Sequence, residues 1–452
     1  MDSPKIAFVG FGEINTPRGV IERLCAEAAG ALKEVSEDVF VTAPVDDAEG
    51  YAHADRAVAE LKKAGDFDLL VVCVAGWIPT HAIIRVIDHF RHKPMLLWAL
   101  CGRRENGKLI STAPMAGASA LQFAMRALKY RFRFVYNCVD EPWPMEKIRA
   151  WAAACGAARK MRGARLGSMG YRDMLLYGTM VDGVSLRDVF GIELEPFEML
   201  EIRAAADDAD AGEVKKWVKT ARDEFVFTEE VSDEVIAESV RWALAIAERI
   251  RGHGYDAVSL IDVDGMKKLL GLPPTFIFNL VDLMCPVSLI PENDLMGSVT
   301  QLMVRYTTGQ VGAYAEYYEF FKDSALVGVP DFIPREVTKG DAVIRPTVFG
   351  LLTTALLNVS RYKDGRVTLA RLLQYDGKYM MHLFCGEAIQ SEPWEEVGWE
   401  PPAPHPSSLE IFPDCGMDDL AAKVGSQHVI LCYGDHRESI GALCELLGVE
   451  VI

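Results

Sequence analysis

The residues best suited to carry chemistry follow one short apolar segment. Residues 287–294 read VSLIPEND, so Glu292 and Asp294 flank Asn293 directly after a proline. Residues 295–306 carry apolar side chains at helical intervals, which places Asn293 or Asp294 at a helix N-cap. Glu292 then lies at the carboxyl end of a strand, where open α/β sheets bind ligands. These residues could equally serve only as caps, and this stretch alone does not decide between the two interpretations.

A second acidic cluster, residues 315–321 (AEYYEFF), follows one helix and one strand later. A βαβ passage returns the chain to the same sheet edge, so Glu316 is predicted to face Glu292 there. Paired carboxylates repel unless a cation or a shared proton intervenes, and a divalent metal is the natural solution. Oxygen ligands with one imidazole suit Mn²⁺ or Mg²⁺ better than zinc. Glu319 is the alternative to Glu316, which we prefer for its Glu-x-Tyr context.

Two of the nine histidines lie in apolar strand patterns. His428 ends the sequence GSQH at the start of an apolar strand, where side chains at a sheet end converge. It is either a metal ligand or a structural residue with its hydrogen bonds satisfied. His382, within YMMHLF, is predicted to lie in the core or to line a barrel.

The first third of the chain carries a candidate ligand-facing loop. Trp77 and His81 lie in AGWIPTH, directly after a predicted strand, and are candidate substrate contacts. A tryptophan beside a proline also commonly serves to pack a loop. The turn at Gly10 and Gly12 lacks the third glycine of a dinucleotide fingerprint, so we do not predict a nicotinamide site.

Short apolar strands alternate with helical patterns through the first two thirds. This alternation predicts parallel sheets covered by helices on both faces. In the first region the strands are residues 5–10, 69–74, 95–100 and 133–137, and the helices include 19–35, 121–130 and 142–161. In the second, the strands are 166–169 and 257–261, the helices are around 186–190, 213–225 and 233–251, and 204–210 (AAADDAD) is a predicted loop.

The last third of the sequence has a different pattern, with short strands in place of alternating strands and helices. Residues 342–356, 366–374, 379–385 and 408–412 read as short strands, with turns at 363–365 (KDG) and 376–377 (DG). Asp-Gly between alternating strands indicates hairpins, so we expect a mainly antiparallel β-barrel or sandwich, closed by a strand at 429–433 and a helix at 438–447. The predicted fold is α/β: two Rossmann-like parallel-sheet domains, 1–164 and 165–334, followed by a β-barrel domain, 335–452. The two acidic residues fall in the middle domain and His428 in the last.

The charge and composition of the chain limit the classes of partner that it is expected to bind. The formal net charge of −18 over 452 residues disfavours nucleic acid and anionic membranes, but not a small neutral sugar. The N-terminus lacks a signal-peptide pattern, and no apolar run approaches the ~18 residues of a membrane span. No two of the ten cysteines form a Cys-x-x-Cys motif, and we predict that all ten are reduced. We therefore expect a cytoplasmic protein without a membrane partner.

Several of these motifs together resemble the L-fucose/L-arabinose isomerase family. They are Glu-x-Asp before a long helix, Glu-x-Tyr after it, SQHVILCYGD at 426–435 followed by a helix ending LLGVE, and LRDVFGI at 186–192. The resemblance implies a metal-dependent aldose–ketose isomerase with two Rossmann-like domains and a barrel. It implies Mn²⁺ held by Glu292, Glu316 and His428. It also implies a homo-oligomer, trimer or hexamer, in which a neighbour's first domain helps to close each site.

The implied reaction explains the residue types. Moving a carbonyl from C1 to C2 requires proton transfer through an enediolate, and Glu292 and Glu316 are assigned jointly as base and acid. Trp77, His81 and Asp294 are the predicted substrate contacts. Val329 stands where the family commonly has a histidine, which argues against ordinary fucose or arabinose as the substrate, and the tail segment 394–406 with His405 points the same way.

Two alternatives remain open at this stage. The first is a related enediolate enzyme acting on a sulfonated or acidic sugar, as an isomerase or decarboxylase. Arg103 and Arg104 are candidates for reading such a charge, although a solvated charged turn explains them as well. The second is a non-catalytic sugar-binding protein.

Overall fold

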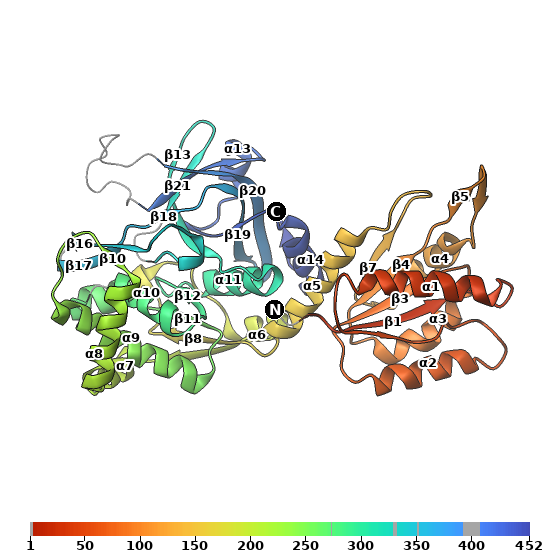
Figure 1. Cartoon of the computed structure of the whole chain (residues 1–452), viewed down its shortest axis with the longest axis horizontal. Coiled ribbons are helices and arrows are strands. Elements are labelled where there is room, and N and C mark those ends of the chain that lie inside the picture. Colours follow the sequence, from red (N-terminus) through yellow and green to blue (C-terminus); the bar gives the residue numbers. More distant parts are fainter. Residues whose placement is uncertain (1–2, 273, 329–331, 350–351, 392–406) are drawn as a thin grey trace. The chain divides into compact units, whose positions relative to one another are not determined.

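The computed structural model describes residues 3–272, 274–328, 332–349, 352–391 and 407–452. The chain divides into two compact units (Figure 1). The first comprises Met1–Arg159 and Glu438–Leu446, and the second comprises Lys160–Arg437 and Leu447–Ile452. The polypeptide therefore leaves the first unit, builds most of the second, returns for one helix and ends in the second.

The first unit is built on a five-stranded parallel sheet in the order β2-β1-β3-β4-β7. These strands are Val39–Val41, Ile6–Phe11, Leu69–Val74, Met95–Ala99 and Phe132–Tyr136. The helices are α1 (Arg18–Leu32), α2 (Ala52–Lys63), α3 (Thr80–Ile87), α4 (Pro114–Ala127), α5 (Met145–Met161) and α14 (Arg437–Leu447), and β5 (Arg103–Glu105) and β6 (Lys108–Ile110) form a hairpin. One core joins one sheet face to α2, α3 and α4, while Trp151 of α5 donates a hydrogen bond to the backbone of β4. The order is that of a doubly wound α/β fold, as predicted.

The second unit begins with a four-stranded parallel sheet in the order β12-β11-β8-β9. Its strands are Ser288–Ile290, Ala257–Leu260, Arg165–Met169 and Glu193–Phe197. Its helices are α6 (Gly183–Phe190), α7 (Met199–Asp207), α8 (Ala211–Glu224), α9 (Asp233–His253), α10 (Thr275–Met284) and α11 (Leu295–Thr308), with a π-helix at Asp262–Leu269.

Part of the predicted loop 204–210 is helical, because α7 runs to Asp207. A capping box between Glu198 and Glu201 starts this helix, and Ile202 and Ala206 bury its apolar side. The run of alanines therefore continues a helix that was already nucleated, and the acidic residues fall at its end.

The second unit also contains a closed six-stranded antiparallel barrel, as predicted for the C-terminal region (Figure 1). The strand order is β19-β22-β13-β14-β21-β20, and β20 closes the ring on β19. The strands are Gly365–Tyr375, His428–Tyr433, Ala313–Phe320, Ala325–Gly328, Ser408–Pro413 and Lys378–Gln390. Strand β23 (Glu450–Val451) pairs with β20, and α13 (Met417–Lys423) connects β21 to β22. The short pair β15 (Thr338–Lys339) and β18 (Arg361–Tyr362) forms a separate ribbon.

Two segments differ from the expected topology. Strand β13 does not return to the parallel sheet after α11 but runs antiparallel between β22 and β14 in the barrel. The predicted βαβ passage from Glu292 to Glu316 is therefore wrong, although the residues still meet. The predicted strand at 342–356 corresponds to β16 (Val343–Phe349) and most of β17 (Leu352–Asn358), which lie outside the barrel, where β16 pairs with both β17 and β10 (Val226–Phe227). Thr275 and Asn279 of α10 hold β17 there by hydrogen bonds.

No helix within the described ranges combines the length and the apolar character needed to span a bilayer.

Candidate metal centre

Glu292 and Asp294 lie in the tight turn that joins β12 to α11. Glu292 and Asn293 both adopt left-handed backbone conformations, with φ of 60° and 45°. Such a pair is unfavourable for residues other than glycine and marks a turn fixed by its surroundings. Asp294 caps α11 by accepting a hydrogen bond from the backbone N–H of Gly297 at 2.8 Å. The predicted cap, Asp294, and the predicted ligand, Glu292, are thus two different residues of one turn.

Glu316 and His428 are brought together by the barrel. They are directly paired across the antiparallel strands β13 and β22. Residues opposite each other in such a pair project from the same face, so the carboxylate and the imidazole lie side by side. Tyr314, two residues before Glu316, packs its ring 4.5 Å from that of His428. The barrel therefore supplies two of the three predicted ligands and one wall around them.

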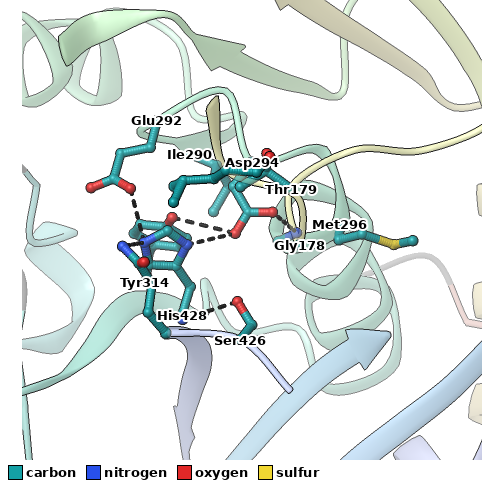
Figure 2. A network of polar contacts seen from close by, with 12 residues as sticks. Gly178, Thr179, Ile290, Glu292, Asp294, Met296, Tyr314, Ser426 and His428 are labelled. Atoms are coloured by element: carbon teal, nitrogen blue, oxygen red, sulfur yellow. Dashed lines mark hydrogen bonds and ion pairs between the residues drawn. The ribbon is translucent and has the colours of Figure 1, made fainter. Parts of the chain in front are cut away.

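The three predicted ligands form one cluster. Each of Glu292, Glu316 and His428 offers a ligand atom, and these atoms lie within 4.8 Å of one another. His428 Nε2 is 2.9 Å from Glu292 Oε2 and 3.3 Å from Glu316 Oε1. Figure 2 shows the Glu292 carboxylate turned toward the imidazole. The side chains of Glu292 and His428 are almost wholly buried, whereas that of Glu316 is 20% exposed and gives the cluster an open side.

Asp294 supports the imidazole from behind (Figure 2). Its Oδ2 lies 3.0 Å from His428 Nδ1 and accepts a hydrogen bond from the Tyr314 hydroxyl at 3.3 Å. Arg371 of β19 forms a buried ion pair with the same carboxylate. Because Asp294 can only accept, Nδ1 carries the proton, and Nε2 is the nitrogen aimed at the two glutamates.

The charges of this cluster are strongly coupled. Burial alone would lower the pKa of His428, but the hydrogen bond to Asp294 and those to the two glutamates raise it well above its ordinary value. Burial would raise the pKa of Asp294, but the Arg371 guanidinium and His428 hold it well below its usual range. The pKa of Glu316 is likewise lowered, because His428 outweighs the effect of burial. The site thus favours the ionised forms of Asp294 and Glu316 beside one cationic group, a charge pattern that a divalent ion can also satisfy.

The remaining sequence candidates near the cluster have other positions. Glu319 is exposed near the end of β13 and is not part of the cluster found among the described residues. Asp294 is fully buried, and protein groups donate to both of its carboxylate oxygens, so it supports His428, and its predicted contact with a substrate stays a prediction. His382 is buried on β20, as its apolar context indicated.

Trp77 and His81 belong to the first unit, whereas the cluster belongs to the second. Trp77 is 39% exposed just after β3, and its backbone N–H donates to the carbonyl of Thr112. His81 lies in the first turn of α3 with its ring edge-on to Tyr51. Their predicted contact with a substrate therefore stays a prediction.

Arg103 and Arg104 form a solvated charged hairpin. Arg103 pairs with Glu105, and Arg104 pairs with Asp140, so each guanidinium already has a carboxylate partner. Val329 and residues 394–406, which include His405, lie outside the described residues.

Two residues of this site, Arg371 and Tyr314, were not predicted from the sequence. Arg371 sits in the otherwise apolar stretch TLARLLQY, and a lone charge inside an apolar strand must be paired when it is buried. That pattern was the available signal for a buried acidic partner. Nothing in the sequence distinguished Tyr314 from the other tyrosines of β13.

No protein-family model matched this chain, and no curated protein matched its sequence.

Proposed function

We propose that this protein is a divalent-metal-dependent aldose–ketose isomerase acting on a sugar or modified sugar through an enediolate. The observation that supports the proposal most directly is the convergence of Glu292, Glu316 and His428 from separate parts of the chain. The resemblance of the same residues to the L-fucose/L-arabinose isomerase family supplies the reaction class.

The donor set fits Mn²⁺ or Mg²⁺. Two carboxylates and one imidazole form the predominantly oxygen environment that these ions accept. The hydrogen bond from His428 Nδ1 to Asp294 keeps a proton on Nδ1, so Nε2 would be the nitrogen that ligates the ion, after giving up its own proton. Glu316 is partly exposed, so a substrate can approach the cluster from its side. When bound, the ion supplies Lewis acidity that polarises the substrate carbonyl and stabilises negative charge on its oxygen.

The two glutamates then account for the proton movements. One carboxylate removes the proton from C2 of the open-chain aldose, and the electron pair of that C–H bond forms the C1–C2 double bond while the carbonyl electrons move to O1. Return of that proton to C1 and transfer of the O2 proton to O1 give the ketose, with no net gain or loss of atoms or electrons. We assign Glu292 and Glu316 to these steps as a pair.

We also propose that the protein forms a homo-oligomer, a trimer or a hexamer, in which Trp77 and His81 of a neighbouring copy contact the sugar. Size measurement in solution, with and without Mn²⁺, tests the assembly independently of the chemistry.

The decisive experiment is an activity screen with Mn²⁺ against aldoses, including acidic and sulfonated sugars, with detection of the ketose. Glu292→Gln and Glu316→Gln should each reduce turnover by at least ~10²-fold, because each removes a proton-transfer group. Glu319→Gln is the matched control: it makes the same change on the same strand, at an exposed position outside the cluster, and should retain activity.

Two results would contradict the proposal. Absence of Mn²⁺ and Mg²⁺ binding by the wild-type protein would remove its basis. A protein that binds a sugar without converting it, and whose binding is unaffected by metal, would instead be a sugar-binding protein.

A further inference from the structure

The backbone of Glu292 is held by a second buried carboxylate. Asp262 is fully buried, and its Oδ1 accepts a hydrogen bond from the backbone N–H of Glu292 at 2.5 Å. Glu292 has the left-handed φ of 60°, so this contact acts on the residue whose conformation most needs support. Asp262 is not part of the cluster of ligand atoms formed by the described residues, and the hydrogen bond that it accepts from Glu292 comes from the backbone N–H.

The turn beyond Glu292 is held from a different direction. The backbone N–H of Asn293 donates to the carbonyl of Leu260 at 2.8 Å. The Asn293 side chain accepts from Ser168 at 2.9 Å and donates to the carbonyl of Tyr171. These contacts fix Asn293 to the carboxyl ends of β8 and β11. The N–H of Glu292, by contrast, points at Asp262.

Asp262 is itself held in place by the start of the π-helix Asp262–Leu269. Asp173 accepts hydrogen bonds from the backbone N–H groups of Val263 and Asp264 at 2.8 and 2.7 Å. π-Helical turns are rare and occur frequently at functional sites, where they offset a side chain from its regular α-helical position. Here the turn places the Asp262 carboxylate under the end of β12, at the Glu292 amide.

We infer that Asp262 is a positioning residue: by accepting the Glu292 N–H it holds the left-handed turn that aims the Glu292 carboxylate at His428. This inference rests on the proposed metal site for its functional consequence. The ends of β12 and α11 are fixed by the parallel sheet and by the Asp294 cap, so the two left-handed residues between them set the direction of the Glu292 side chain. A relaxed turn directs the ligand away from the cluster without unfolding either element.

The test compares Mn²⁺ affinity, measured by titration calorimetry, in three variants of the full chain. Asp262→Ala should weaken binding at least tenfold, the range in which loss of an outer partner of a metal ligand falls. Asp262→Asn keeps an oxygen that can accept the Glu292 N–H and should stay within about threefold of wild type, the uncertainty of a single hydrogen-bond replacement. Ser259→Ala is the matched control, because Ser259 is equally buried and donates to the carbonyl of Ile290 in β12 without touching the turn.

A merely structural role predicts a different pattern. Asp262→Ala and Ser259→Ala would then lower the melting temperature while the folded fraction binds Mn²⁺ as wild type does, and this result would overturn the inference. If Asp262→Ala is not recovered folded, Asp262→Ser makes the same comparison, because its side chain is too short to reach the Glu292 amide in the same way.

A crystal structure of the metal-free Asp262→Ala or Asp262→Ser protein separates this inference from the proposed function. The inference predicts that Glu292 Oε2 moves away from His428 Nε2, which lies 2.9 Å from it in the wild-type chain. An unchanged Glu292 position would overturn the inference whether or not the wild-type protein binds metal. Failure of the wild-type protein to bind metal would overturn the proposed function alone.

Discussion

At the scale of single residues, the candidate centre depends on charges that satisfy one another. Asp294 makes three contacts: it caps α11, forms an ion pair with Arg371 and accepts a hydrogen bond from His428 Nδ1. These three partners are all buried, so water cannot replace Asp294 if its charge is lost. The imidazole is thus oriented by a group that never needs to touch a metal or a substrate.

Asp294→Asn tests this arrangement. The amide keeps the shape but leaves the Arg371 charge buried without its counter-ion, so the free energy of unfolding should fall by about 3 kcal/mol. Mn²⁺ affinity should fall by about tenfold or more, because His428 loses its charged partner. Denaturant unfolding and metal titration measure the two effects. Asp414→Asn, which disrupts the more exposed ion pair with Arg366, should change stability by about 1 kcal/mol or less. Equal effects from the two variants would refute the special role of Asp294.

The buried imidazole of His382 should make the stability of the protein depend on pH. Burial, with a smaller contribution from Lys423, lowers the pKa of His382 from 6.5 to about 4, and Asp419 opposes this only weakly. In the unfolded chain the imidazole binds a proton below about pH 6.5, whereas the folded protein resists doing so until about pH 4. Stability should therefore fall as the pH is lowered from about 6.5 to about 4, by on the order of 2 to 3 kcal/mol from this residue.

The measurement is the midpoint of urea unfolding at several pH values. His382→Phe keeps an aromatic ring beside Phe384 and should flatten the curve between pH 4 and 6.5, whereas substitution of the exposed His92 by Gln should not. An unchanged slope in the His382→Phe protein would show that this imidazole is not the source of the pH dependence.

At the scale of elements, the parallel strands were predictable and the destination of β13 was not. The strand at residues 69–74 is a continuous apolar run, and in the structure all six residues of β3 are buried. Residues 313–320 show no such run, and their pattern fits a parallel strand after α11 as well as a barrel strand. The choice depends on pairing with β22, more than a hundred positions away in the sequence, which no local pattern encodes.

The same limit applies to the site. Glu292 and Glu316 were predicted through a passage that the chain does not make, and His428 was predicted as a ligand only through the family resemblance. The network behind them, with Arg371 on β19 and Asp262 on a π-helix, depends on burial of isolated charges. A sequence shows that such a charge exists but not which partner compensates it.

Gly328 of β14 gives a prediction at this scale. Gly328 lies opposite Glu316 on the adjacent strand β13. A Cβ at Gly328 would lie 2.4 Å from the backbone carbonyl oxygen of Ser407, in the segment leading into β21. Gly328→Ala should force β14 and β21 apart and lower stability by about 1 to 3 kcal/mol. Because Glu316 lies on the neighbouring strand, Mn²⁺ binding should weaken as well.

Thermal unfolding and metal titration of the purified variant measure both effects. Gly441→Ala is the control, since a Cβ at this position in α14 meets open space and alanine favours a helix by about 1 kcal/mol over glycine. A Gly328→Ala protein as stable as wild type would contradict the close approach of the strands.

At the scale of the whole molecule, every predicted ligand belongs to the second unit. Saturating Mn²⁺ should therefore stabilise that unit by about 2.7 kcal/mol at one hundred times the dissociation constant. If the two units melt in separate calorimetric transitions, only the transition of the second should move. His428→Ala should abolish the shift, and an equal shift in that variant would place the metal elsewhere.

The return of α14 to the first unit bears on how the protein is made. Arg133 of β7 pairs with both Glu438 and Glu445 of this helix, and Ile440, Leu443 and Cys444 of α14 are fully buried. A ribosome releases the five strands of that sheet long before it translates residues 438–446, so the core of the nascent first unit stays incomplete until those residues emerge. A premature stop near residue 435 would consequently damage the amino-terminal part of the polypeptide as well as its end.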